Sequence, residues 1–281
     1  MMATKKIRKA TGSLLEFACL LSALLVLLAL CLILYYIFRR GIGAINIPFL
    51  ISLPTPVGEP GGGIGNALIG SALMVALGSL LAIPFGIAAA IYLDQNPRTR
   101  LAAATRFANR VLTGVPSLII GLFVFTVLVL RTGNYSALAG GIALAVMMIP
   151  VITLSAEEML RLVPGSLREA SLALGASKKQ TVLMLILPAA TGGLVVGIML
   201  AVALAAGQTA PVLLTALTSR FWLENLNQTS ASLPVLIYNY ASSPFPDWQE
   251  QAWGAALVLV ATILILNVTA QLFVVFRNRR H

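Results

Sequence analysis

Residues 64–93 read IGNALIGSALMVALGSLLAIPFGIAAAIYL, a stretch of 30 residues that contains no charged side chain. A helix that crosses the hydrocarbon core of a bilayer needs about 20 predominantly apolar residues, so this stretch is long enough to cross. Backbone polar groups in lipid must find partners within their own segment, which favours a helix over an open strand. The stretch therefore predicts a membrane-spanning helix.

Five further apolar stretches of similar length lie on either side of it, at 17–38, 111–130, 137–156, 183–206 and 253–276. Of the 281 residues, 59% are hydrophobic and only 10% are charged. Soluble domains carry about a quarter charged residues, so a soluble globular protein is excluded. The sequence predicts an all-α, polytopic membrane protein with six transmembrane helices and no separate soluble domain.

The first apolar stretch follows a basic segment, so a cleaved secretory signal is an alternative to a retained helix. It is long for the apolar region of a signal and has no small-residue cleavage site after it, which favours a retained anchor. The expected organisation is a cytoplasmic tail (1–13), a first transmembrane helix (14–38), an extracytoplasmic loop (39–63), a core of five transmembrane helices (64–276) with an inner loop (157–181) and an outer loop (207–251), and a cytoplasmic tail (277–281).

The basic residues indicate the orientation, because cytoplasmic loops of membrane proteins are enriched in lysine and arginine. With both termini inside, the outer segments hold only four of the 19 lysines and arginines, namely Arg39, Arg40, Arg131 and Arg220. We therefore expect a multi-pass plasma-membrane protein with both termini in the cytoplasm. The formal net charge of +10 follows from this topology, and no basic helix or aromatic-studded sheet suggests a nucleic-acid partner.

Hydrolytic and metal chemistry have few residues to work with. Cys19 and Cys31 both lie in the first apolar stretch, and the single histidine is His281 at the end of the chain. Zinc sites and general acid–base catalysis rely on clustered histidine, cysteine and carboxylate side chains. We therefore predict no catalytic residue, no metal site and no cofactor in this chain.

Small residues recur every fourth position in two of the apolar stretches, as Gly78, Ala82, Gly86 and Ala90, and again as Gly193, Gly197, Ala201 and Ala205. In lipid, such stripes let helix backbones approach closely, and they predict two helix interfaces. Chance in a glycine- and alanine-rich sequence is the alternative. Prolines at 84, 116 and 150 lie within or near the spans and are expected to kink or interrupt them.

The inner loop 157–181 is too polar to cross a membrane and too patterned to be disordered. Ser166 and Glu169 have the spacing of a capping box, which predicts a helix start. An apolar face of small residues follows, and Gly175 can adopt the positive φ that ends a helix. The result is a short helix that is marginal alone in water, so we expect it to dock against another protein. A helix lying on the lipid surface is the alternative.

The segment REASLALG at 168–175, followed by Ile186, Leu187 and Pro188, resembles the EAA motif of ABC importer permeases. The resemblance implies a type I importer fold in which this short helix couples to a cytoplasmic ATPase subunit. The residues that it assigns to this coupling are Ser166, Glu169, Ala170, Leu174 and Gly175.

Further stretches resemble the phosphate-importer permeases of the PstA type, at 82–93, 114–117, 121–123, 207–211, 232–234, 237–238 and 252–254. Together they extend over about three quarters of the chain, from 65 to 276. The family implies half of a pathway for inorganic phosphate in the bacterial inner membrane. Its partners would be two copies of an ATPase, a second permease of the PstC type and an extracytoplasmic phosphate-binding protein.

The energy source must lie in a partner, because the chain has no phosphate-cradling G-x-x-x-x-G-K-[ST] loop. ATP and magnesium are therefore expected in the ATPase subunit, and this chain is expected not to be an enzyme. Secondary carriers show inverted repeats and midplane ion ligands, which are not evident here. A secondary transporter or a membrane scaffold without an ATPase is thus the remote alternative.

Three positions at which the phosphate family usually has charged residues are uncharged here, namely Leu154, Leu204 and Gln208. This difference keeps open a permease for another oxyanion, such as sulfate, thiosulfate or molybdate. A partly dehydrated anion needs donors that replace its water. The candidates in this chain are Thr113 and Ser117 around the third-span proline, and Gln208 and Thr209 after the fifth span, with Gln208 the first choice.

Overall fold

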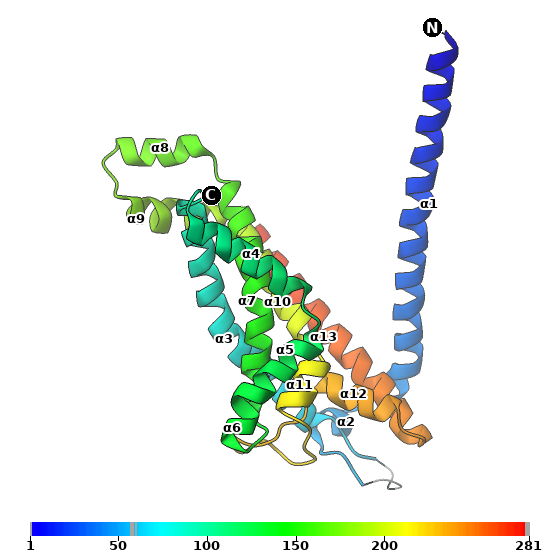
Figure 1. The fold of residues 1–281 in the computed structure, drawn as a ribbon. Coiled ribbons are helices and arrows are strands. Elements are labelled where there is room, and N and C mark those ends of the chain that lie inside the picture. The colour runs from blue at the N-terminus through cyan, green and yellow to red at the C-terminus, as the bar shows by residue number, and fades with distance from the viewer. Residues whose placement is uncertain (1, 57–58, 60, 279–281) are drawn as a thin grey trace.

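The computed structural model describes residues 2–56, 59 and 61–278, and within these residues the chain is helical with no strand (Figure 1). In chain order the elements are α1 (Met2–Gly41), η1 (Ile42–Ala44), α2 (Ile47–Ile51), α3 (Gly65–Gln95), α4 (Arg100–Gly114), α5 (Ser117–Val124), the π-helical η2 (Phe125–Val129), α6 (Leu130–Thr132), α7 (Ala137–Arg161), α8 (Gly165–Ala173), α9 (Lys178–Gln180), the π-helical η3 (Thr181–Ile186), α10 (Leu187–Ala206), α11 (Ala210–Thr215), α12 (Leu233–Ala241) and α13 (Pro246–Asn278). The predicted all-α class is confirmed.

Five helical segments are long and apolar enough to cross a bilayer, namely α1, α3, α7, the run from α9 through η3 to α10, and α13. The predicted third span, 111–130, is wrong as a single helix, because α4 and α5 meet at an angle of 105°. The cause is Pro116, which has no backbone N–H and disfavours helical geometry in the residue before it. Val115 is accordingly extended, with φ −72° and ψ 128°. The chain has six spans only if this bent pair is counted as one.

Helix α7 forms the centre of the bundle, with α3 and α10 packed against it (Figure 1). A Cβ atom added at Gly86 of α3 would lie 2.7 Å from Ile152 Cγ2 of α7. One added at Gly197 of α10 would lie 2.7 Å from Ser155 Cβ, also on α7. Both predicted small-residue stripes therefore form helix interfaces, and they share α7 as their partner.

Helix α1 stands away from the bundle over most of its length and meets it only near the end of the helix (Figure 1). There, the rings of Tyr36 and Trp253 of α13 pack edge to face with centroids 5.1 Å apart. The helix begins at Met2, so residues 2–13, predicted as a separate tail, continue the helix backbone. Of the predicted tail 277–281, residues 279–281 lie outside the described residues.

The outer loop 207–251 is more structured than a simple connection. It contains α11 and α12, and α13 begins within it at Pro246. Helix α12 is anchored to the bundle at its first residue, where Leu233 N donates to Ser71 Oγ of α3 over 2.8 Å. The segment just before α12 lies directly on α3, since a Cβ added at Gly70 would approach Ala231 O within 2.1 Å. The loop therefore closes the end of the bundle opposite α8 and α9 (Figure 1).

Candidate functional site

A cavity of about 160 Å³ lies halfway along α7, between the bend of α4 with α5 and the end of α10. Its lining comprises Leu112, Thr113, Val115, Ile120, Met147, Met148, Val151, Ala201, Leu204, Ala205 and Gln208. The fold thus brings together Thr113 and Gln208, which are 95 residues apart in the sequence. Leu204, one of the uncharged positions noted in the sequence, lines the same cavity. The lining carries no ionisable side chain.

Gln208 owes its position to the end of α10. The helix stops at Ala206, and Gln208 N donates to Ala205 O over 3.1 Å, which turns the chain back toward the bundle. The side chain lines the cavity described above and also a second, much smaller one of about 10 Å³, which it shares with Ser71 and Ser232. The side-chain amide of Gln208 makes no hydrogen bond to any residue that the structure describes, so its two N–H groups are available to a ligand.

The other predicted donors contribute less. Thr113 Oγ1 donates to Arg110 O over 2.8 Å, so its proton is already engaged. Ser117, the first residue of α5, and Thr209, which precedes α11, do not line this cavity. The candidate site therefore rests on Gln208, with Thr113 beside it.

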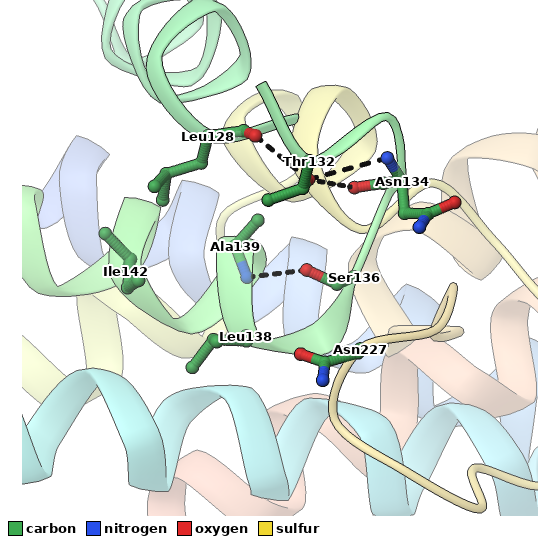
Figure 2. A pocket seen from close by; sticks show the side chains of 8 residues that line it. All are labelled: Leu128, Thr132, Asn134, Ser136, Leu138, Ala139, Ile142 and Asn227. Atoms are coloured by element: carbon green, nitrogen blue, oxygen red, sulfur yellow. Dashed lines mark hydrogen bonds between the residues drawn. The ribbon is translucent and has the colours of Figure 1, made fainter. Parts of the chain in front are cut away.

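A larger pocket of about 310 Å³ lies between the end of η2 and the start of α7 (Figure 2). Its hydroxyl groups are used locally: Ser136 Oγ accepts from Ala139 N over 3.1 Å and Thr132 Oγ1 donates to Leu128 O over 2.9 Å. None of its lining side chains is charged. The pocket is thus explained by two helix ends, and it offers no strong ligand group.

The inner loop, with α8 and α9, projects from the bundle at the end where α13 finishes (Figure 1). The predicted capping box at Ser166 is wrong, because α8 begins at Gly165 with Pro164 as its N-cap and no side-chain cap. Pro164 has φ −56°, and the helix begins two residues too early for Ser166 to cap it. A capping box does occur in this loop, at Ser177 and Gln180 before α9.

The residues that the EAA resemblance assigns to coupling all lie on the exposed surface of this loop. Ser166, Glu169, Ala170 and Gly175 are exposed, and Leu174 is 89% exposed although it is a large apolar residue. Gly175 has φ +85°, as predicted, which ends α8 and turns the chain toward α9. Leu162, Leu167 and Leu172 of the same loop are exposed as well, and a group of exposed apolar residues is a feature of surfaces that bind other proteins.

Arg168 fastens this loop to the bundle. Its Nη1 donates to Asp94 Oδ2 over 2.6 Å, and its Nη2 donates to Asp94 Oδ1 over 2.9 Å and to Leu160 O over 2.7 Å. The guanidinium group thus joins α8 to the C-terminal ends of α3 and α7. From the sequence, Arg168 is assigned to the cytoplasmic side and to the EAA-like segment, but the pairing with Asp94 is not predicted, because that partner lies 74 residues away.

A second ionic cluster lies nearby on α7. Glu157 Oε1 accepts from Arg106 Nε of α4 over 2.7 Å and from Arg161 Nη2 over 2.6 Å. Arg106 also donates to the carbonyl groups of Leu93 and Pro97 at the end of α3. Glu157 therefore holds α4 against α7, and Arg106 holds α4 against the end of α3.

Comparison with known proteins agrees with these features. The family profile "binding-protein-dependent transport system inner membrane component" matches residues 82–280. The phosphate transport system permease protein PstA of Haemophilus influenzae is 42% identical over 267 residues, which cover 95% of this chain and 94% of that protein. PstA of Yersinia pestis is 40% identical, over 89% of this chain and 84% of its own length.

Solved structures show the same fold at low identity. A chain of the MetNI methionine ABC transporter in an inward-facing conformation is 19% identical, with a TM-score of 0.61 over 74% of this chain and 94% of that one. A chain of an amino acid ABC transporter crystallised with histidines is 14% identical, with a TM-score of 0.53 over 78% of this chain and 93% of that one. The profile match and the curated relatives show that the chain belongs to the binding-protein-dependent transport system inner membrane component family.

Proposed function

We propose that this chain is the permease subunit of an ATP-driven ABC importer and forms half of the membrane pathway for inorganic phosphate. The similarity to PstA permeases over 95% of the chain is the observation that carries the substrate. The exposed α8, tied to the bundle through Arg168, supports coupling to a separate ATPase. The chain itself would then hydrolyse nothing.

Its proposed partners follow from this role. Two copies of an ATPase subunit bind ATP with magnesium and hydrolyse it. Each permease presents its α8 to one copy. A second, PstC-type permease completes the pathway, and an extracytoplasmic phosphate-binding protein delivers the anion. In Figure 1 the start of α1 and the end of α13 point to the same side of the molecule as α8, which supports a cytoplasmic location for both termini.

A second permease has an available surface next to the cavity. Leu200 and Leu204 of α10 and Phe123 of α5 are exposed and apolar, and Leu204 also lines the cavity. A face of this kind can meet either lipid or another apolar helix. We propose that the second permease covers it, so that the cavity becomes enclosed between the two subunits.

The cavity suits an anion that must pass without being held. Phosphate has to shed part of its water in a medium of low dielectric constant, so polar groups must replace that water. Gln208 offers amide N–H donors without a fixed charge. Conduction requires binding that is strong enough for entry but weak enough for release, and neutral donors satisfy both conditions.

The test uses the assembled transporter in vesicles and measures ATP-dependent uptake of labelled phosphate. Gln208→Leu should lower uptake without loss of assembly, and Gln271→Leu on the exposed face of α13 serves as the matched control. Gln208→Glu should be worse alone than together with Leu204→Arg, because both positions line one cavity and the new charges can pair there. Unimpaired uptake in Gln208→Leu, or additive effects in the pair, would assign conduction to the partner permease.

Competition decides the substrate. Unlabelled phosphate should abolish uptake, whereas sulfate, thiosulfate and molybdate in equal excess should leave it unchanged. Uptake of one of these other oxyanions in place of phosphate would support the alternative permease. Uptake that persists when the ATPase is inactive would instead support a secondary carrier.

A further inference from the structure

Two buried side-chain atoms in the described part of the chain have no hydrogen-bond partner, Asn109 Nδ2 and Ser232 Oγ. Asn109 is 6% exposed and Ser232 is 2% exposed. Buried polar groups in folded proteins are nearly always paired, because an unpaired one has lost its water and gained nothing in return. Each therefore requires an explanation, and their positions supply one.

Ser232 lies on the outer side of Gln208. Both residues line the small cavity of about 10 Å³. Ser232 is the N-cap residue of α12, yet its side chain accepts no cap hydrogen bond. Its hydroxyl group is therefore free at a helix N-terminus, where the backbone dipoles create a partial positive charge that favours anions.

Asn109 lies on the inner side of the cavity of about 160 Å³ that Gln208 and Thr113 line. On α4, Arg106, Asn109 and Thr113 follow one another at intervals of three and four residues, which places them on one face. That face is turned toward α7, because Arg106 pairs with Glu157 and Thr113 lines the cavity with Met148. Asn109 thus lies between the cavity and the ionic cluster.

Helix α7 gives the order of these groups across the bundle. Leu144 borders the small cavity, Met148 and Val151 border the larger one, and Glu157 holds Arg106. At 1.5 Å per residue, these contacts extend over roughly 20 Å of helix. The unpaired groups of Ser232 and Asn109 therefore lie on the two sides of Gln208 along one line.

We propose that Ser232 and Asn109 are further oxyanion-contacting donors, and that with Gln208 they form a series of neutral donors along α7. The inference rests on the proposed phosphate function and extends it to two residues. Each of these unpaired groups would gain a partner as the anion passes. The small cavity holds about one water molecule at most, so in this conformation the series is closed at Ser232 and open at Gln208.

Removal of the unpaired groups separates this role from a structural one. Ser232→Ala and Asn109→Leu delete a penalty of the folded state, so neither should lower the thermal unfolding midpoint of the purified complex. Each should nevertheless lower ATP-dependent phosphate uptake at least fivefold. Ser230→Ala and Thr105→Val are the matched controls, because these hydroxyl groups already donate to Ala231 O and Leu101 O. The controls should keep full uptake.

Chemical access provides a measurement that does not depend on activity. Ser232→Cys and Asn109→Cys, each in a chain without Cys19 and Cys31, should react with a small anionic methanethiosulfonate reagent during ATP turnover. Phosphate should slow the reaction if both anions use the same path. Ser230→Cys, buried two residues from Ser232, should stay unreactive.

The outcomes distinguish the two levels of the proposal. Phosphate uptake by the unmodified complex, together with full uptake and no phosphate-sensitive labelling in the Ser232 and Asn109 variants, would overturn this inference and leave the proposed function intact. Absence of phosphate uptake by the unmodified complex would contradict the proposed function, and this inference with it.

Discussion

The free energy that holds the inner loop against the bundle can be estimated from the contacts of Arg168. In Asp94→Asn, the arginine loses its ionised partner, while Arg168 keeps its bond to Leu160 O. The Asp94 side chain is 5% exposed and that of Arg168 is 23% exposed, so the pair is largely screened from water. Breaking a buried ion pair costs about 3–5 kcal/mol, and the remaining bond and partial exposure favour the lower end.

A loss of about 3 kcal/mol corresponds to a roughly 100-fold increase in the population of the undocked loop. Hydrogen exchange of the purified protein measures this population through the amides of residues 162–174, which include Leu162 N bonded to Glu158 O. Exchange there should rise by about 100-fold, whereas α3 and α7 should keep their protection. Glu158→Gln, an exposed acid in the same region, is the control and should change exchange little.

A double-mutant cycle decides whether the pair itself is responsible. Arg168→Gln removes the ion pair and also the bond to Leu160 O, so it should raise exchange at least as much as Asp94→Asn, and the double variant should add nothing to Arg168→Gln. Exchange within a few fold of the unmodified protein in Asp94→Asn, or effects of the single variants that simply add, would refute the assignment. In that case α8 would be held by contacts other than the guanidinium group.

Three further outcomes are expected. Gly175→Val should weaken substrate-stimulated ATP hydrolysis by the complex, because a left-handed backbone conformation costs a residue with a side chain about 1–2 kcal/mol or more. The control Gly165→Ala, in the same loop, should keep full stimulation. Full stimulation in the valine variant would contradict a coupling role. Cysteines placed singly at Ser177 and Ser242, in a background without the native cysteines, should label from the cytoplasmic and outer sides respectively, and reversed labelling would overturn the orientation. Glu157→Ala should lower the thermal unfolding midpoint, because two guanidinium groups lose their buried partner at a cost of about 3–5 kcal/mol; an unchanged midpoint would show that α4 is held by packing alone.

Most of the helical plan was predictable, because hydropathy reports directly on which segments can enter lipid. The small-residue stripes were also informative, since close backbone approach has few other solutions. The bend at Pro116 shows the limit of such patterns. A proline indicates that a helix is interrupted, but the 105° angle between α4 and α5 depends on packing against α7 and α11 that no local pattern encodes.

The site divides in the same way. Gln208 and Thr113 could be proposed from residue type and position, and the fold places them at one cavity. The capping box was assigned to the wrong serine, because Ser166 and Ser177 both precede an acid or amide at the required spacing and only Pro164 distinguishes them. Asn109 was missed, although its spacing from Arg106 was a usable signal. Its unpaired amide becomes visible only once its neighbours are placed.

Because α1 packs little against the rest of the chain, substitutions in it report on its surroundings in the membrane. None of its most apolar window is buried within the chain, and the family profile begins only at residue 82. Substitutions along most of α1 therefore leave the internal packing of the bundle unchanged, and selection on them comes from whatever surrounds the helix. The substitutions that a growing cell tolerates in α1 would thus show which α1 residues contact lipid or other proteins in the membrane. The substitutions tolerated in α7 would instead show which residues the internal packing of the protein requires.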